Sequence, residues 1–199
     1  MINLLEIENY IKNFYGKYNP TENVYHSLNH VVDVVTAVQK ISRYSQLSQS
    51  DVNLVTAAAW FHDIGHIEIW EGHEELSANY AKEYFQLSKV SEQEIKIITD
   101  CIKVTGLPHY PKNLLEEIIC DADVSYIGSE YFFEKSNLLR LELVSRKSKI
   151  YGEPEWIQKN IDFVINSHFF TNYGKEIFEP VKRNNLELLY ESLKIFSEK

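Results

Sequence analysis

The sequence predicts an all-α fold, and three observations support this prediction. Apolar residues recur at three- and four-residue spacing along nearly the whole chain, as they do in amphipathic helices. Glycine and proline are scarce, with 7 and 5 among 199 residues, so few positions interrupt a helix. No run of residues alternates between polar and apolar as a half-buried strand does, and the sequence contains no internal repeat.

The N-terminal half is expected to form a series of helices with recognisable starts. Ser27 is a suitable N-cap for the second helix, and Ser91 with Glu94 forms a capping box for the fifth. The third helix contains the apolar run from Leu54 to Phe61, whose small alanines predict tight packing against a neighbour. The expected ranges are 2–14, 28–44, 51–62, 71–87 and 91–104.

The C-terminal half continues the helical pattern after a loop over residues 105–112. Pro154 suits the first turn of a helix. Pro180 either starts the last helix or kinks it, and the sequence leaves both alternatives open. The expected ranges are 113–119, 129–150, 154–168 and a last helix that ends at about residue 196.

No linker is long or polar enough to separate domains, so one domain is expected over residues 1–199. Its motif core spans about residues 20–145, and the helices of residues 153–196 pack on that core. Hydrophobic residues make up 44% of the chain and charged residues 25%, which are ordinary values for a globular protein with one sizeable core.

Charge and composition exclude several classes of function. The formal charge of −9 argues against coating nucleic acid or binding an anionic membrane, although a bound cation can still attract an anionic substrate. No apolar segment reaches the length of a membrane span, and residues 1–10 do not resemble a signal peptide, so the expected location is the cytoplasm.

Cys101 and Cys120 are expected to be buried free thiols. Nothing indicates a homo-oligomer, although one remains open.

Several histidines and aspartates interrupt the apolar faces of the expected helices. Burying such groups is costly unless they are paired or bound to a metal. His62 and His66 stand four residues apart, so they share a face if the helix continues. Any one of these residues is more often structural than functional, but together they predict helix ends that converge on one ion. The set comprises His26, His30, His62, Asp63, His66, His73, His109 and Asp123.

The order His, His-Asp, Asp resembles the HD superfamily of metal-dependent phosphohydrolases. Residues 25–30 (Tyr-His-Ser-Leu-Asn-His) are similar to a segment found in its cyclic-nucleotide phosphodiesterase branch. Residues 61–66 (Phe-His-Asp-Ile-Gly-His) resemble the central motif, and residues 73–78 resemble the acidic helix start of the small predicted HD phosphohydrolases. Residues 121–123 (Asp-Ala-Asp) resemble the closing motif of the same group. The resemblance covers about residues 20–190 and implies a helical bundle with a central metal site.

The resemblance also implies roles for individual residues. His30, His62, Asp63 and Asp123 would bind one metal ion. His26 would donate a proton to the leaving oxygen, and His66 would contact a water on the metal or the substrate phosphate. As a ligand of the ion that activates water, Asp63 is counted among the catalytic residues together with His26 and His66. Asp121 would orient a ligand or bind a backbone amide.

His73 and His109 occupy places where dinuclear HD proteins carry two further histidines. The resemblance therefore leaves open a second ion, which Asp63 would bridge to the first. Mixed nitrogen and oxygen ligands suit Mn, Fe, Co, Ni or Zn, and Mg is retained as a further candidate. A bound divalent ion lowers the pKa of water from 15.7 towards about 7 and polarises a phosphoryl oxygen.

The expected function is hydrolysis of a small phosphoester, a nucleotide or related phosphate, by water that the metal activates. Arg140 and Lys103 are the first candidates for binding the phosphate, because cations stabilise negative charge in the transition state. Two alternatives stay open: an HD-type oxygenase with two irons, and a non-catalytic module that binds a metal or a ligand. The expected partner is thus a small molecule, with no nucleic acid and no membrane.

Overall fold

The computed structural model describes residues 2–197; the outermost positions of the expected domain, residue 1 and residues 198–199, lie outside it. Within the described residues every regular element is a helix, which confirms the all-α prediction. The elements are α1 (Leu4–Tyr18), α2 (Leu28–Tyr44), α3 (Gln49–Phe61), the 3₁₀ turn η1 (Ile64–Ile67), α4 (His73–Leu87), α5 (Glu92–Lys103), α6 (Leu114–Asp123), the 3₁₀ turn η2 (Ser125–Gly128), α7 (Phe132–Lys147), α8 (Glu153–Asn166), the π-helical turn η3 (Gly174–Phe178) and α9 (Glu179–Ser197).

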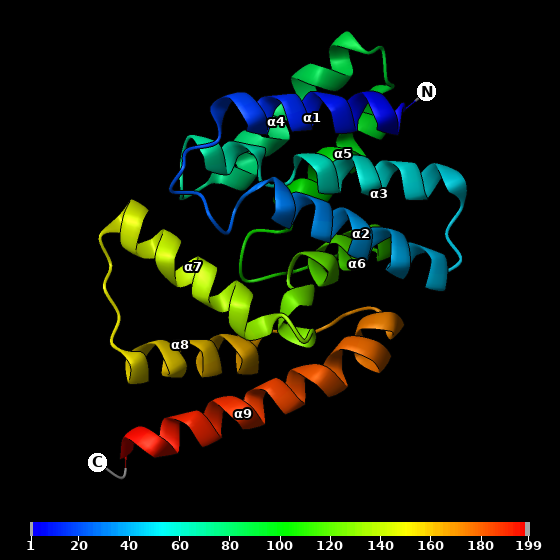
Figure 1. Ribbon diagram of the computed structural model, residues 1–199. Coiled ribbons are helices and arrows are strands. Elements are labelled where there is room, and N and C mark those ends of the chain that lie inside the picture. Colours follow the sequence, from blue (N-terminus) through cyan, green and yellow to red (C-terminus); the bar gives the residue numbers. More distant parts are fainter. Residues whose placement is uncertain (1, 198–199) are drawn as a thin grey trace.

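The helices form two groups, each with its own apolar cluster. Helices α1 to α6 lie together in the upper part of Figure 1, α8 and α9 lie below them, and α7 lies at the left, level with α2 and α6. The larger cluster comes from α1–α6, and the smaller one from η2 and the C-terminal helices. Phe178 of η3 packs against both clusters, so this turn connects the C-terminal helices to the group formed by α1–α6.

Helix α3 is the central element of the larger group. Its residues Leu54 to Phe61 are all buried, and Ala57, Ala58 and Ala59 have no exposed surface. The helix contacts α1, α2, α4, α5 and α6, and small side chains let these neighbours approach closely. The tight packing predicted from the alanines is confirmed, and the C-terminus of α3 therefore points its last side chains into the interior.

Several helix boundaries differ from the sequence prediction, among them those of α6 and α7. The helix expected at 113–119 continues to Asp123, so the closing Asp-Ala-Asp segment is helical. The helix expected at 129–150 spans Phe132–Lys147 and stops where Ser148 adopts a left-handed conformation with φ 52°. Pro180 lies in the first turn of α9, directly after η3.

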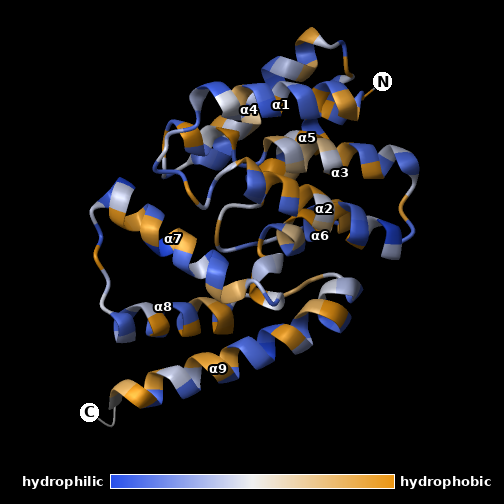
Figure 2. Cartoon of the chain, viewed as in Figure 1, coloured by the Kyte–Doolittle hydropathy of each residue, from blue (hydrophilic) through white to orange (hydrophobic). Residues whose placement is uncertain are grey.

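Most helices carry both polar and apolar residues along their length, as the mixed colours of Figure 2 show. Among residues 2–197, no helix combines the length and the hydropathy needed to cross a bilayer. Cys101 and Cys120 are both buried and unbonded to each other, as predicted, and burial raises the pKa of the Cys101 thiol to about 12. Neither thiol is therefore a reactive thiolate near neutral pH.

Candidate metal centre

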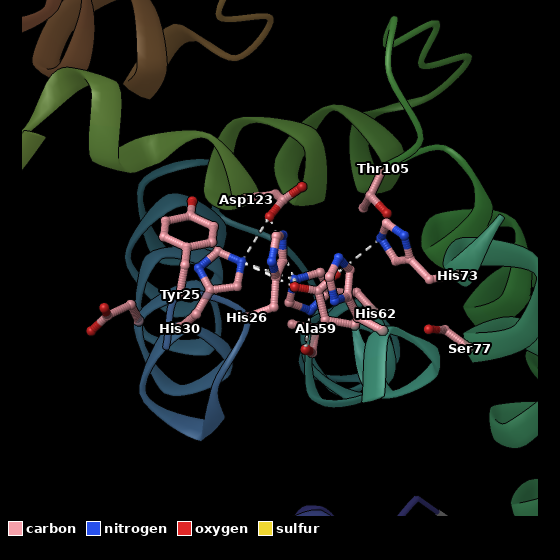
Figure 3. Close-up of polar contacts among 12 residues, drawn as sticks. Tyr25, His26, His30, Ala59, His62, His73, Ser77, Thr105 and Asp123 are labelled. Atoms are coloured by element: carbon pink, nitrogen blue, oxygen red, sulfur yellow. Dashed lines mark hydrogen bonds and ion pairs between the residues drawn. The ribbon is translucent and has the colours of Figure 1, made fainter. Parts of the chain in front are cut away.

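The ends of three helices bring two imidazoles and two carboxylates together. His30 lies in the first turn of α2, and His62 follows the last residue of α3. Asp63 has φ −109° and ψ 6°, so the chain leaves the α3 helix there and both side chains turn into the same space. Asp123 is the last residue of α6. Figure 3 shows His30, His62 and Asp123 converging from these separate elements.

The two imidazoles lie at nearly equal distances from the two carboxylates. The Nε2 atom of His30 lies 3.3 Å from Asp63 Oδ2 and 3.2 Å from Asp123 Oδ1. The Nε2 atom of His62 lies 3.3 Å and 3.4 Å from the same two oxygens. The two Nε2 atoms are themselves 3.4 Å apart. Ligands that are adjacent around an octahedral ion at about 2.1–2.3 Å are separated by about 3.0–3.3 Å, so the spacing fits a divalent transition metal.

Hydrogen bonds alone do not account for this cluster. Asp63 Oδ2 is buried and lacks a hydrogen bond of good geometry, although two imidazoles face it. The Nδ1 atom of His62 donates to the carbonyl of Ala59 at 2.8 Å, since a carbonyl can only accept, and the tautomer of the neutral ring leaves the Nε2 lone pair directed at the cluster. A buried oxygen without a well-aligned hydrogen bond and a nitrogen lone pair aimed at the same point are what a metal ion requires.

The charge balance of the cluster also favours a cation. Burial by itself lowers the pKa of His62, but the carboxylates of Asp63 and Asp123 outweigh burial and raise that pKa well above its ordinary value. Burial by itself raises the pKa of Asp63, but the charge on His62 and hydrogen bonds from the surrounding imidazoles hold it well below its usual range. The cluster therefore stabilises positive charge at its centre.

His73 faces the other oxygen of Asp63. Its Nε2 atom lies 3.4 Å from Asp63 Oδ1, and its Nδ1 atom donates to the carbonyl of Trp70 at 2.7 Å. Asp63 thus points one oxygen at the four-residue cluster and the other at His73, as a bridging carboxylate would. His109 does not complete a second site: its Nε2 atom lies 3.1 Å from the carbonyl of Thr105, and it is absent from the described lining of the cavity.

A second polar group lies beside the metal cluster and is held by α7. Glu142 is fully buried; its Oε2 accepts the backbone N–H groups of Tyr25 and His26 at 2.7 and 3.0 Å, and its Oε1 lies 2.6 Å from His26 Nδ1. The ring of His26 stacks on that of His66 with centroids 3.7 Å apart and an interplanar angle of 14°. Arg146 donates to His66 Nδ1 at 3.0 Å and to the His66 carbonyl at 2.6 Å.

These contacts give the two stacked imidazoles different proton arrangements. His26 Nδ1 donates to the Glu142 carboxylate, which leaves its Nε2 on the opposite edge of the ring. His66 Nδ1 accepts from the Arg146 guanidinium, so the neutral ring carries its proton on Nε2. Burial first, and then the proximity of His26, lower the pKa of His66 to about 2, so this ring stays neutral.

The cations predicted to bind phosphate lie elsewhere. Arg140 donates to Glu153 at 2.6 Å and to the carbonyl of Tyr151 at 2.6 Å, in a separate hollow between α7, α8 and α9. Lys103 pairs with Glu75 at 2.7 Å on an exposed surface. Neither residue is among those that line the cavity beside the cluster.

Glu142 and Arg146 were not singled out from the sequence as functional residues. Their one sequence signal is a spacing of four residues, which puts both on the same face of α7. Their contacts are with residues about 80 to 117 positions away, which periodicity cannot reveal. Asp121, in contrast, accepts the backbone N–H groups of Phe170 and Thr171 at 2.8 and 2.9 Å, which is one of the two roles expected for it.

An open cavity of about 680 Å³ adjoins the cluster. His30, Asp63 and Asp123 line it, together with His26, His66 and His73. His62 is completely enclosed behind them. A small molecule in the cavity would therefore contact the candidate metal and the stacked imidazoles at once.

Comparison with known proteins finds a match to one protein family and to two solved structures. Residues 27–125 match the family model of the HD domain. The chain shares its fold with a predicted HD superfamily hydrolase from an uncultured Thermotogales bacterium, with a TM-score of 0.57 and 17% identity over 81% of this chain and 87% of that one. A crystal structure of a Lactobacillus plantarum protein gives a TM-score of 0.69 and 14% identity over 100% of this chain and 98% of that one. No curated protein matches the chain.

Proposed function

The chain belongs to the HD-domain family, and we propose that it is a metal-dependent hydrolase of small phosphoesters, namely nucleotides or related phosphates. One observation carries the proposal: on three helix ends beside a cavity of about 680 Å³, two imidazole Nε2 atoms lie 3.4 Å apart, and each lies 3.2–3.4 Å from an oxygen of two carboxylates. The donor set of His30, His62, Asp63 and Asp123 suits Mn, Fe, Co, Ni or Zn, with Mg a further candidate.

A divalent ion held by these residues would lower the pKa of water and polarise a phosphoryl oxygen. The chain's own contribution begins with Asp63, whose Oδ2 makes no well-aligned hydrogen bond and whose position is fixed by the turn after α3. The Ala59 carbonyl holds the ring of His62 in one orientation. Both ligands are thereby preorganised, which reduces the cost of assembling the site.

His26 is the proposed proton donor to the leaving oxygen. Glu142 accepts from its Nδ1 and fixes the ring, while Nε2 remains available on the cavity side. His66 stays neutral because Arg146 occupies its Nδ1, so its Nε2–H is proposed to donate to a phosphoryl oxygen. The two rings would therefore act on the same phosphate, His26 as the proton donor and His66 as a hydrogen-bond donor.

A second candidate function has one observation in its favour. Asp63 Oδ1 and His73 Nε2 lie 3.4 Å apart, so a second ion could share Asp63 with the first, as an oxygenase with two irons would need. Of the expected ligands, two face this second position, His73 and Asp63, against four at the first. We therefore propose one tightly bound ion and treat the second position as a site of lower metal affinity. Turnover with Mn or Co as the only metal would separate hydrolysis from oxygen chemistry.

The proposed function is tested with metal-reconstituted protein and a panel of phosphoesters that includes nucleotides. We expect hydrolysis that depends on added Mn or Co and is lost in Asp63→Asn, which keeps the shape of the side chain and removes its charge. Asp162→Asn on the exposed face of α8 is the matched control, since Asp162 contacts only Gln158 and Asn166 through its own polar atoms. Asp63→Asn retaining both stoichiometric metal and activity would overturn the proposal.

A further inference from the structure

The cavity is larger than a phosphate requires. The candidate metal ligands and the histidines form one side of a space of about 680 Å³, within the range of about 300–1,000 Å³ that holds ligands of cofactor or drug size. The rest of the space is bounded by residues that have no part in the proposed chemistry. The chemistry of these residues therefore indicates which organic group of a substrate the cavity would bind.

One face of α8 supplies much of this remaining wall. Trp156, Lys159, Asn160 and Phe163 follow at intervals of three and four residues, so they share a helix face, and all four line the cavity. The ring of Phe163 lies nearly parallel to that of Tyr126, with an interplanar angle of 16° and centroids 6.4 Å apart. These flat apolar surfaces suit an aromatic ring better than a sugar or an alkyl chain.

Hydrogen bonds within the protein fix the side chains of this wall. Trp156 Nε1 donates to Ser136 Oγ at 3.0 Å, and Ser136 Oγ donates to Asn160 Oδ1 at 2.6 Å. Asn160 Nδ2 in turn donates to the Trp156 carbonyl at 2.7 Å. The polar atoms of Trp156 and Asn160 are thus bonded within the protein, and a ligand meets their apolar surfaces in a fixed arrangement.

Charge is distributed unevenly around the cavity. Glu71 and Glu74 line the side formed by the start of α4, whereas Lys159 is the one lysine or arginine among the described lining residues. Lys159 takes part in none of the ion pairs found within residues 2–197, and its Nζ lies 5.0 Å from the centre of the Tyr151 ring. An anionic group could therefore bind Lys159 without displacing a carboxylate.

We propose that the substrate is a phosphoester whose organic part is an aromatic group of nucleoside size, packed on the α8 face, with a second anionic group bound by Lys159. This inference rests on the proposed function, because the candidate metal site must hold the scissile phosphate. It adds a specificity wall of Trp156, Phe163 and Tyr126, and one specificity-determining cation, to the site already described.

A binding series on the metal-loaded protein tests the inference. The ligands are 2-deoxyribose 5-phosphate, thymidine 5′-monophosphate and thymidine 3′,5′-bisphosphate, which add first an aromatic base and then a second phosphate. By calorimetry, we expect the base to tighten binding at least about tenfold. The second phosphate should tighten it about tenfold more, the size of one charge-assisted hydrogen bond.

Two variants separate the contributions. Lys159→Gln should remove the gain from the second phosphate and leave the gain from the base. Phe163→Leu, which keeps an apolar side chain, should reduce the gain from the base and leave deoxyribose phosphate binding unchanged. Lys175→Gln is the matched control, because Lys175 is also exposed, has no ion pair among the described residues and does not line the cavity.

The outcomes distinguish this inference from the proposed function. If all three ligands bind equally well and phosphoesters are hydrolysed, the function stands and the aromatic wall is refuted. If the gain from the second phosphate survives in Lys159→Gln, the assignment of Lys159 is refuted. If neither phosphate binding nor hydrolysis is found with any metal, the proposed function itself fails.

Discussion

At the scale of single residues, the metal cluster and its neighbours divide the work. Two carboxylates and two imidazoles create a site for positive charge, and Glu142 and Arg146 fix the adjacent histidines. The four candidate ligands could be anticipated from the sequence, because each interrupts an apolar helix face and their order resembles a known family. Glu142 and Arg146 could not, because their role depends on which distant backbone and ring atoms α7 approaches.

His26 gives a prediction about leaving groups. In His26→Asn the amide can still donate to Glu142, but it cannot transfer a proton. We expect the variant to bind metal normally and to hydrolyse phenyl phosphate about 100-fold or more slowly, while p-nitrophenyl phosphate, which needs no proton on its leaving oxygen, is affected much less. Steady-state rates on the two esters measure this, and equal losses on both would remove His26 from the role of acid.

His66 gives a prediction about pH. Its pKa is about 2 in the folded protein and about 6.5 when unfolded, so as pH falls below 6.5 the unfolded chain takes up a proton that the native ring does not. The free energy of unfolding should then fall by about 1.4 kcal/mol per pH unit. His30, His62 and His73 have raised pKa values in the metal-free protein, so below pH about 6.5 they are protonated in both states and add no slope.

The test is urea unfolding of metal-free protein between about pH 6 and about pH 5, above the range where carboxylates titrate. We expect His66→Gln to be clearly less pH-dependent than the natural protein. His168→Gln is the control, since His168 is exposed and outside the cluster. A slope that is unchanged in His66→Gln and altered in His168→Gln would show that His66 is protonated in the native state.

At the scale of elements, the close approach of η1 to α4 positions His73. The N–H of Gly65 donates to Ser77 Oγ at 2.9 Å, and a Cβ added at Gly65 would lie 2.5 Å from the carbonyl oxygen of His73 and 2.9 Å from the backbone nitrogen of Ser77. Both obstacles are backbone atoms, so the helix would have to move. The short 3₁₀ and π-helical turns that create such approaches were not predicted, because they follow from packing and not from periodicity.

Gly65→Ala should therefore lower the free energy of unfolding by about 1–3 kcal/mol through overpacking. Gly16→Ala is the comparison, because nothing lies within 4 Å of a Cβ there and α1 should gain about 0.5 kcal/mol from the better helix former. Denaturant unfolding of both variants measures the difference. Equal effects would mean that η1 and α4 are not in such close contact.

At the scale of the whole molecule, a metal bound by the candidate ligands would connect α2, α3 and α6. The presence and type of most helices were predicted from the sequence, but the separation into two groups with different apolar clusters was not, since nothing in a periodic pattern says which helices pair. A ligand that binds only the folded protein raises its stability. At a metal concentration about 100 times the dissociation constant, the gain is about 2.7 kcal/mol.

Manganese should thus raise the Tm of the chelated protein by about 5–10 °C, given a shift of about 2–4 °C per kcal/mol at this chain length. Asp123→Asn should abolish the shift, whereas Asp162→Asn should preserve it. Differential scanning calorimetry in the presence of a chelator and after metal addition measures both. An undiminished shift in Asp123→Asn would mean that the stabilising ion binds elsewhere.

The most direct test of the account is the anomalous-difference map of a crystal of the manganese-loaded protein. The account predicts a peak about 2.0–2.4 Å from the Nε2 atoms of His30 and His62 and from the carboxylates of Asp63 and Asp123. A peak at another place, or no peak among these four side chains in protein that turns over phosphoesters, would contradict it.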